Sequence, residues 1–163
     1  MVVEASVVSL HAAPEGGVPK PAVPTLSVTK GGCVGDRQRD LKHHGGPTRA
    51  LCLWSFEVLQ TLRQEGHPVR PGDVGENVLI KGLSFADLSE GDVLEVGAVR
   101  ARLTGPAPPC RTIQAAFTDG AFRAVDANAR FDRTRWYAEV LVEGELRPGD
   151  AVRLRKDGPI EGP

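Results

Sequence analysis

A cysteine stands directly behind a run of prolines in the segment TGPAPPCRTI, Thr104 to Ile113. Each proline fixes φ near about −65° and has no N–H, so the backbone that enters Cys110 is stiff and cannot pair as an ordinary strand. Arg111 follows at once, and a neighbouring cation favours the thiolate, which attacks electrophiles and binds soft metals. Cys110 is therefore the candidate nucleophile or metal ligand, with a purely structural cysteine as the alternative.

A second candidate segment is the basic loop GDRQRDLKHHGGPTRA. Its glycines let backbone N–H groups approach a ligand, and its basic side chains offer donors to an anion such as phosphate. The residues concerned are Arg37, Lys42, His44 and Arg49. A solvated basic loop explains the same composition equally well.

The third segment, PGDVGENV, contains a Gly-Glu-Asn triplet that includes Glu76 and Asn77. Such a triplet is usually only a turn, and the residues by themselves do not decide whether it binds anything. The remaining cysteines, Cys33 and Cys52, share no CxxC spacing with Cys110. An odd number of cysteines without an export signal indicates free thiols rather than disulfides, and the four histidines do not complete a zinc-finger pattern.

The elements that position these segments are mostly short strands. Glycine and proline, 19 and 13 residues, divide the chain into short pieces. The pattern predicts strands around Val3 and Val7, at 25–28, within 71–85, and at 98–105 and 135–144. The related segments LSEGDVLEVG and LRPGDAVRLR each predict a Gly-Asp turn followed by a strand.

Apolar residues at helical spacing predict one long helix over about 48–65, and residues 111–117 and 120–129 predict short helices. The helix would present Leu51, Trp54, Val58, Leu59 and Leu62 on one face and end near Gly66. The expected fold is mainly β (α+β): a mixed β-barrel with one long helix and one or two short ones.

Length and composition limit the possible function classes. The 163 residues suit one domain, 40% hydrophobic residues are ordinary for a globular protein, and the formal net charge is −1. Near-neutral charge and few aromatic residues argue against nucleic-acid binding and against binding to an anionic membrane. No apolar run approaches the roughly 20 residues of a membrane span, and the N-terminus resembles a strand rather than a signal peptide. We therefore expect a cytoplasmic protein.

The candidate segments, taken in order, resemble the MOSC domain, the C-terminal domain of molybdenum cofactor sulfurases. The resemblance rests on VGDRQRD, HHGGPTRAL, SFEVL, RPGDVGENVLIKGL, LSEGDVLEVG, PPC and RWYAEVLVEGELRPGD. It extends from about Lys20 to Leu154, which implies one MOSC-like domain over residues 1–163 with a core of about 20–154.

The resemblance implies a cysteine in a cleft that ligates molybdenum in a pterin cofactor, with basic residues around the cofactor phosphate. The implied catalytic residue and metal ligand is Cys110. The positions implied for binding the molybdenum cofactor (Mo-molybdopterin) are Lys20, Asp36, Arg37, His44, Gly45, Gly46, Arg49, Glu76, Asn77 and Arg111, with Gly35 and Gly75 beside them.

Family members of this kind reduce N-hydroxylated compounds, so the implied partners are a small-molecule substrate and a separate electron donor. No fused ferredoxin or lyase segment is recognisable. In the sulfurase setting the domain is thought to bind cofactor or to carry sulfur, so a sulfur carrier loaded on Cys110 by a cysteine desulfurase is the alternative. A third hypothesis is a cofactor-binding module without catalytic activity.

One position departs from the family pattern. Family members often have arginine in a Pro-Arg-x-Pro-Cys approach to the cysteine, and this chain has Ala107 there. We therefore expect an anion contact to be lost at this point, or to be supplied by Arg111.

Overall fold

Short apolar segments form strands at most of the places where the sequence alternates. The structure, a computed structural model, describes residues 4–37 and 47–156. Seven strands form the closed part of the main sheet. They are β1 (Ala5–His11), β5 (Leu51–Ser55), β6 (Val78–Lys81), β7 (Val93–Val96), β8 (Val99–Ala107), β9 (Arg135–Val142) and β11 (Ala151–Arg155). The other four strands are β2 (Ala22–Val23), β3 (Leu26–Thr29), β4 (Gly32–Cys33) and β10 (Gly144–Leu146).

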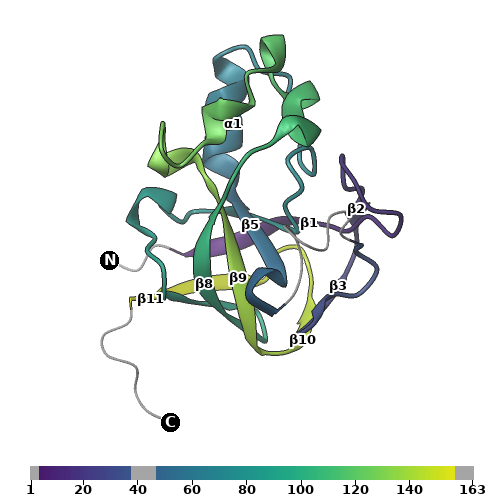
Figure 1. Cartoon of the computed structure of the whole chain (residues 1–163). Helices are drawn as coiled ribbons and strands as arrows, with labels where there is room; N and C mark the ends of the chain where they lie inside the picture. Colours follow the sequence, from purple (N-terminus) through teal and green to yellow (C-terminus); the bar gives the residue numbers. More distant parts are fainter. Residues whose placement is uncertain (1–3, 38–46, 157–163) are drawn as a thin grey trace.

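The main sheet closes on itself (Figure 1). The seven strands of the ring follow the order β1, β11, β7, β8, β9, β5 and β6, and β6 pairs with β1 to complete it. β5 and β6 are parallel, whereas the other neighbours in the ring are antiparallel. β2 extends the sheet beyond β1, and β10, β3 and β4 form a separate three-stranded sheet. The prediction of a mixed β-barrel is confirmed.

The barrel wall is buried on both sides over β5, β6 and β9. On β9, Trp136 and Ala138 face the main core inside the barrel, and Tyr137 lies on the outer side. The outer side of β5 and β6, including Trp54 and Leu79, packs under a second apolar cluster. This outer cluster includes side chains of the helical segments described next.

Most of the helical segments gather at one end of the barrel, whereas residues 47–49 lie at the opposite end of strand β5 (Figure 1). They are α1 (Phe56–Gln64) and the 3-10 helices η1 (Pro47–Arg49), η2 (Phe85–Asp87), η3 (Arg111–Ala116), η4 (Thr118–Gly120), η5 (Phe122–Val125) and η6 (Phe131–Arg133). Of the segments predicted as short helices, residues 111–116 and 122–125 are helical, in 3-10 form, whereas residues 126–129 are not helical. No helix in residues 4–37 or 47–156 is both long and apolar enough to cross a bilayer.

The predicted long helix over 48–65 is wrong in its first half. Residues 51–55 form strand β5, and α1 begins only at Phe56. Leu51 and Leu53 face the barrel interior while Cys52 and Trp54 face outward, so all five strand residues are buried. A strand buried on both faces is apolar throughout, and its residues matched helical spacing by coincidence.

Ser55 marks the point where the strand becomes a helix. It is the last residue of β5 and the N-cap of α1, and its side-chain oxygen accepts a hydrogen bond from the Val58 N–H at 3.2 Å. α1 then buries Leu59 and Leu62 against the outer barrel wall and carries the chain to the start of β6, parallel to β5.

We predict that Ser55→Ala lowers the free energy of unfolding by about 1 kcal/mol, because the first turn of α1 loses its side-chain acceptor. Urea unfolding followed by circular dichroism measures the change. Gln60→Ala, on the exposed face of the same helix, is the matched control and should leave stability almost unchanged. Equal stability of Ser55→Ala and the native protein would contradict the assigned cap.

Candidate functional site

Cys110 lies where strand β8 gives way to the 3-10 helix η3. Its backbone is extended, with φ −143° and ψ 176°, and the Ile113 N–H donates to the Cys110 carbonyl at 3.1 Å. The side chain is partly exposed, and its Sγ lies 2.7 Å from Oγ1 of Thr112. The proline approach thus ends in a thiol at the surface, in a fixed turn.

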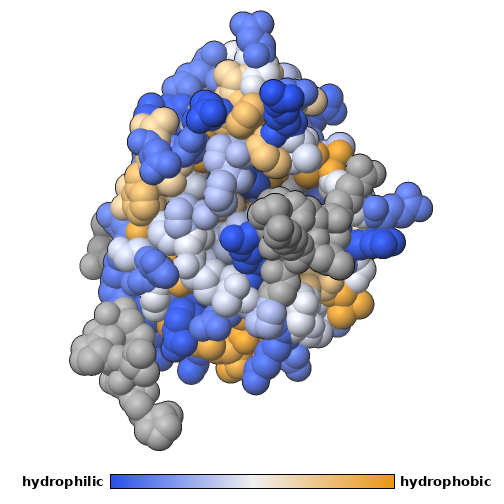
Figure 2. All heavy atoms as spheres, in the orientation of Figure 1, coloured by the Kyte–Doolittle hydropathy of each residue, from blue (hydrophilic) through white to orange (hydrophobic). Residues whose placement is uncertain are grey.

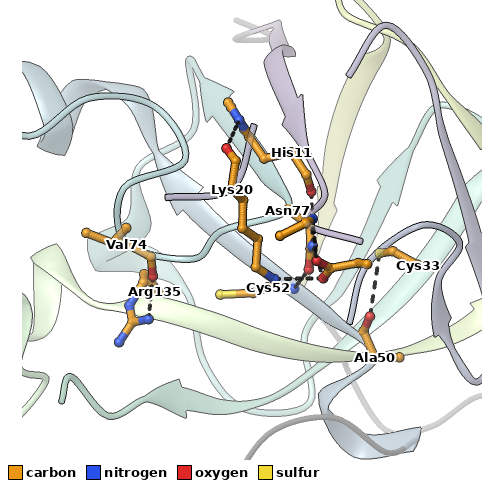
Figure 3. Close-up of polar contacts among 10 residues, drawn as sticks. His11, Lys20, Cys33, Ala50, Cys52, Val74, Asn77 and Arg135 are labelled. Atoms are coloured by element: carbon orange, nitrogen blue, oxygen red, sulfur yellow. Dashed lines mark hydrogen bonds and ion pairs between the residues drawn. The ribbon is translucent and has the colours of Figure 1, made fainter. Parts of the chain in front are cut away.

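The other two cysteines are buried inside the protein. Burial raises the pKa of Cys33 to about 12 and that of Cys52 to about 11, with nearby Asp36 adding to the rise at Cys33. Cys33 Sγ contacts the Ala50 carbonyl at 3.6 Å (Figure 3). Neither is a thiolate at neutral pH, so Cys110 is the cysteine available for chemistry.

The carboxylate of Asp36 lies at the centre of a buried polar network. Its Oδ2 accepts hydrogen bonds from Lys20 Nζ at 2.7 Å and from Asn77 Nδ2 at 2.8 Å. Its Oδ1 accepts from the Ala13 N–H at 2.9 Å. The side chains of Lys20 and Asp36 are only 7% and 4% exposed. The structure therefore brings together three predicted site residues from distant parts of the sequence.

Asn77 connects this network to the barrel strands. Its Oδ1 accepts from the Cys52 N–H at 3.0 Å, and its Nδ2 also donates to the His11 carbonyl at 3.1 Å. Figure 3 shows Lys20, Asn77 and Cys52 close together. The side-chain amide thus binds Asp36 and two strands at once, and these contacts fix the loops around the site.

Glu76, beside Asn77, is fully buried. Its Oε2 accepts from the Gly72 N–H at 2.8 Å, whereas Oε1 has no hydrogen-bond partner among the described residues. Burial is the main cause that raises the pKa of Glu76 to about 7, and the nearby Arg135 charge opposes the rise. Gly72 has φ +89°, and a Cβ there would lie 2.1 Å from the Lys20 carbonyl oxygen, so this tight turn requires glycine.

An arginine and a tyrosine line the outer barrel wall near Cys110. The Arg49 guanidinium carbon lies 5.2 Å from the centre of the Tyr137 ring, within cation–π range. Tyr137 packs with Cys52 and Ala107, and burial raises the pKa of its hydroxyl to about 12. Ala107 is three residues before Cys110, so Tyr137 packs against the proline approach to the candidate thiol.

The remaining predicted residues have different positions. Arg37 and Arg111 are exposed, and Arg49 is half-buried. His44, Gly45 and Gly46 lie outside the described residues, so their predicted role stays a prediction. Over β8 and β9, the surface has a centre of intermediate hydropathy bordered by strongly hydrophilic residues (Figure 2).

The departure at Ala107 has a structural counterpart. Ala107 is fully buried against Cys52 and Tyr137, and its partner across the β8–β9 ladder is Arg135. Arg111, which we expected to replace the missing cation, is an exposed residue at the start of η3. Sequence reasoning missed Arg135. Its only signal was a charged residue at the start of a largely apolar strand.

The described residues contain no group of three or more His, Cys, Asp or Glu side chains that could hold a metal ion. A metal at Cys110 would therefore have this thiolate as its ligand from the described part of the protein, with further ligands supplied by a cofactor. A single soft thiolate beside arginines suits such a group.

Comparisons with known proteins agree on one family. A family model of the MOSC domain matches residues 40–153. The uncharacterized protein YflK of Bacillus subtilis (strain 168) is 28% identical over 144 residues, which are 88% of this chain and 64% of YflK. Protein YiiM of Escherichia coli (strain K12) is 28% identical over 134 residues, which are 79% of this chain and 58% of YiiM. The chain thus spans less than two thirds of the length of either relative.

Solved structures share the fold. The YUAD protein from Bacillus subtilis matches with a TM-score of 0.75 and 20% identity, covering 93% of this chain and 95% of that one. YiiM from Geobacillus stearothermophilus matches with a TM-score of 0.70 and 22% identity, covering 93% and 75% of the two chains.

We predict that Asp36→Asn lowers the free energy of unfolding by about 3–5 kcal/mol, because it leaves the buried Lys20 ammonium without its anion. Chemical denaturation measures the loss. Asp132→Asn removes a carboxylate from a half-exposed pair with Arg130 and should change stability by less than about 0.5 kcal/mol. Similar effects of the two substitutions would contradict the central place of Asp36.

The raised pKa of Glu76 leads us to predict that the stability of the protein depends on pH. Its pKa is near 7 in the folded protein and 4.5 ordinarily, so the folded state binds the proton more tightly. The free energy of unfolding should therefore fall as pH rises from about 4.5 to about 7, by an amount on the order of 3 kcal/mol. Glu76→Gln should remove this fall and be the more stable protein at about pH 8. Parallel pH profiles of the two proteins in urea unfolding would contradict the assignment.

Proposed function

The chain belongs to the MOSC domain family, and from that premise we propose that it binds a molybdenum cofactor with Cys110 as the metal ligand. The observation that carries the proposal is the state of the three cysteines. Two are buried with raised pKa values, and the third is held at the surface by a proline approach. A cysteine so placed can offer its sulfur to a bound group without rearrangement of the backbone.

The residues around Cys110 suit an anionic cofactor. Arg111 is exposed beside the thiol, and Arg49 is held over Tyr137 on the adjacent wall. Guanidinium groups bind phosphate through paired donors, so these two residues and Arg37 are the proposed contacts for the cofactor phosphate. Lys20, Asp36 and Asn77 bind one another, and their proposed contribution is to hold the surrounding loops in place.

The proposed reaction is the reduction of an N-hydroxylated small molecule. When bound, the molybdenum cofactor would supply two-electron redox chemistry. The overall reaction takes R–NH–OH, two electrons and two protons to R–NH₂ and water, so the N–O bond breaks and nitrogen is reduced. The electrons would come from a separate donor protein. In this scheme Cys110 binds and orients, and Arg111 is placed to bind a polar group of the substrate or the cofactor.

A sulfur carrier is the second candidate, favoured by the accessible thiol of Cys110 next to the Thr112 hydroxyl. In this reaction the Cys110 thiolate attacks the outer sulfur of a cysteine desulfurase persulfide. A new S–S bond forms on Cys110, and the desulfurase cysteine leaves as a thiolate. The carrier then passes this sulfur to an acceptor and needs no bound cofactor.

We predict that protein from a host that makes the cofactor contains molybdenum, and that Cys110→Ser loses nearly all of it. Native mass spectrometry with metal analysis measures both. Cys52→Ser, at a buried thiol, is the control for loss of a cysteine in general and should retain the metal if it folds. Metal-free native protein that carries one additional sulfur on Cys110 would replace the proposal with the sulfur carrier.

The same preparation tests the reaction. Metal-containing protein with a chemical reductant should convert an aromatic N-hydroxylamine to its amine, and Cys110→Ser should not. Metal-free protein that stays inactive after addition of cofactor and reductant would overturn the reductase proposal.

A further inference from the structure

The proline approach to Cys110, residues 106–109, has few backbone hydrogen-bond donors. Residues Pro106, Pro108 and Pro109 have no N–H, so within this stretch only Ala107 has a backbone donor. The ladder with β9 ends at Ala107, and between Ala107 and Cys110 the segment has carbonyl acceptors but no amide N–H of its own. A stiff segment of this kind needs donors from elsewhere if it is to hold a fixed place.

Arg135 supplies those donors. It is the first residue of β9, lies opposite Ala107 in the ladder, and is 5% exposed. One terminal nitrogen, Nη2, donates to the Ala107 carbonyl at 3.2 Å and to the Pro108 carbonyl at 3.1 Å. The last of these carbonyls is two residues before Cys110.

The other terminal nitrogen reaches a different part of the chain. Nη1 of Arg135 donates to the Val74 carbonyl at 2.7 Å, in the turn that leads to Glu76 (Figure 3). The rigid planar guanidinium thus fixes the proline approach relative to the Gly72–Asn77 turn. Through Asn77, that turn is joined to Asp36 and Lys20.

The surroundings of Arg135 differ from those of Arg133, the buried arginine two residues before it. Arg133 donates to both carboxylate oxygens of Glu65, at 2.7 and 2.6 Å. Among the described residues, no carboxylate forms an ion pair with Arg135, and its hydrogen bonds go to backbone carbonyls. Burying a guanidinium without an ion pair is unfavourable for folding, so stability alone does not account for its presence.

We infer that Arg135 is a positioning residue for Cys110, which holds the donor-poor proline approach by its carbonyl groups. The inference rests on the proposed function, in which the Cys110 thiol is the metal ligand. A lysine at 135 would keep the charge but lose the planar pair of donors. A methionine would fill similar space and offer no donor.

The test measures the mobility and accessibility of the Cys110 segment directly in the metal-free full chain. In Arg135→Met we expect backbone hydrogen exchange at Cys110 to Ile113 to rise by about tenfold, because the segment opens more often when its carbonyl contacts are lost. Alkylation of Cys110 by iodoacetamide, followed by peptide mass spectrometry, should accelerate as well. Arg135→Lys should lie between the native protein and Arg135→Met in both measurements.

The matched control is Arg133→Met. It removes an equally buried arginine and the Glu65 pair, so it lowers stability while leaving exchange and alkylation at Cys110 unchanged. If Arg135→Met does not fold, Arg135→Lys and Arg135→Gln provide the same comparison. Native-like exchange at Cys110 in the folded Arg135 variants, or an equal rise in Arg133→Met, would overturn the inference.

This outcome is separate from that of the proposed function. If Cys110→Ser keeps its molybdenum while Arg135→Met loosens the Cys110 segment, the positioning role stands and the ligand proposal fails. If Cys110→Ser loses the metal and Arg135→Met leaves the segment unchanged, the ligand proposal stands and the positioning role fails.

Discussion

The buried contact between Asp36 and Lys20 is the interaction on which the architecture of the site depends. Removing two charges from water is costly unless each finds partners, and here a backbone N–H and the Asn77 amide complete the set. Because these partners come from four separate segments, the network specifies how the N-terminal loops lie against β5 and β6. The described chain up to Arg37 is therefore held in a fixed place.

The region around Glu76 and the proline approach depends instead on the buried positive charge of Arg135. Arg135 binds carbonyls and lies near Glu76, whose carboxyl is poised between its neutral and charged forms around neutral pH. Nε of Arg135 and Oε1 of Glu76, a donor and an acceptor, are both buried without a hydrogen-bond partner among the described residues. The Asp36 network thus has its polar groups satisfied by direct contacts, while the region of Arg135 and Glu76 keeps two buried polar atoms without a partner in the described part of the chain.

Several features of this arrangement could be predicted from the sequence. Alternation located β8 and β9 because each has one face in the barrel core. The prolines before Cys110 indicated a thiol on a stiff backbone segment. The β5 segment was misassigned because burial on both faces erases the alternation that identifies a strand. Arg135 was missed because its partners are backbone carbonyls, which leave no trace in residue types. The grouping of Lys20, Asp36 and Asn77 followed only from family resemblance, since contacts across such separations have no local pattern.

The pairing that closes the barrel has a consequence for biosynthesis. β1 is among the first segments of the described chain and pairs with β11, where Ala5 lies opposite Val152. The ring cannot close until β11 has left the ribosome. Until then β1 and β7 each present an unpaired strand edge, which is a site for wrong pairing between nascent chains. Such long-range closure is slow compared with local folding. The β5–α1–β6 unit, which is contiguous in sequence, can form before this closure, but the edges of β1 and β7 stay open until β11 arrives.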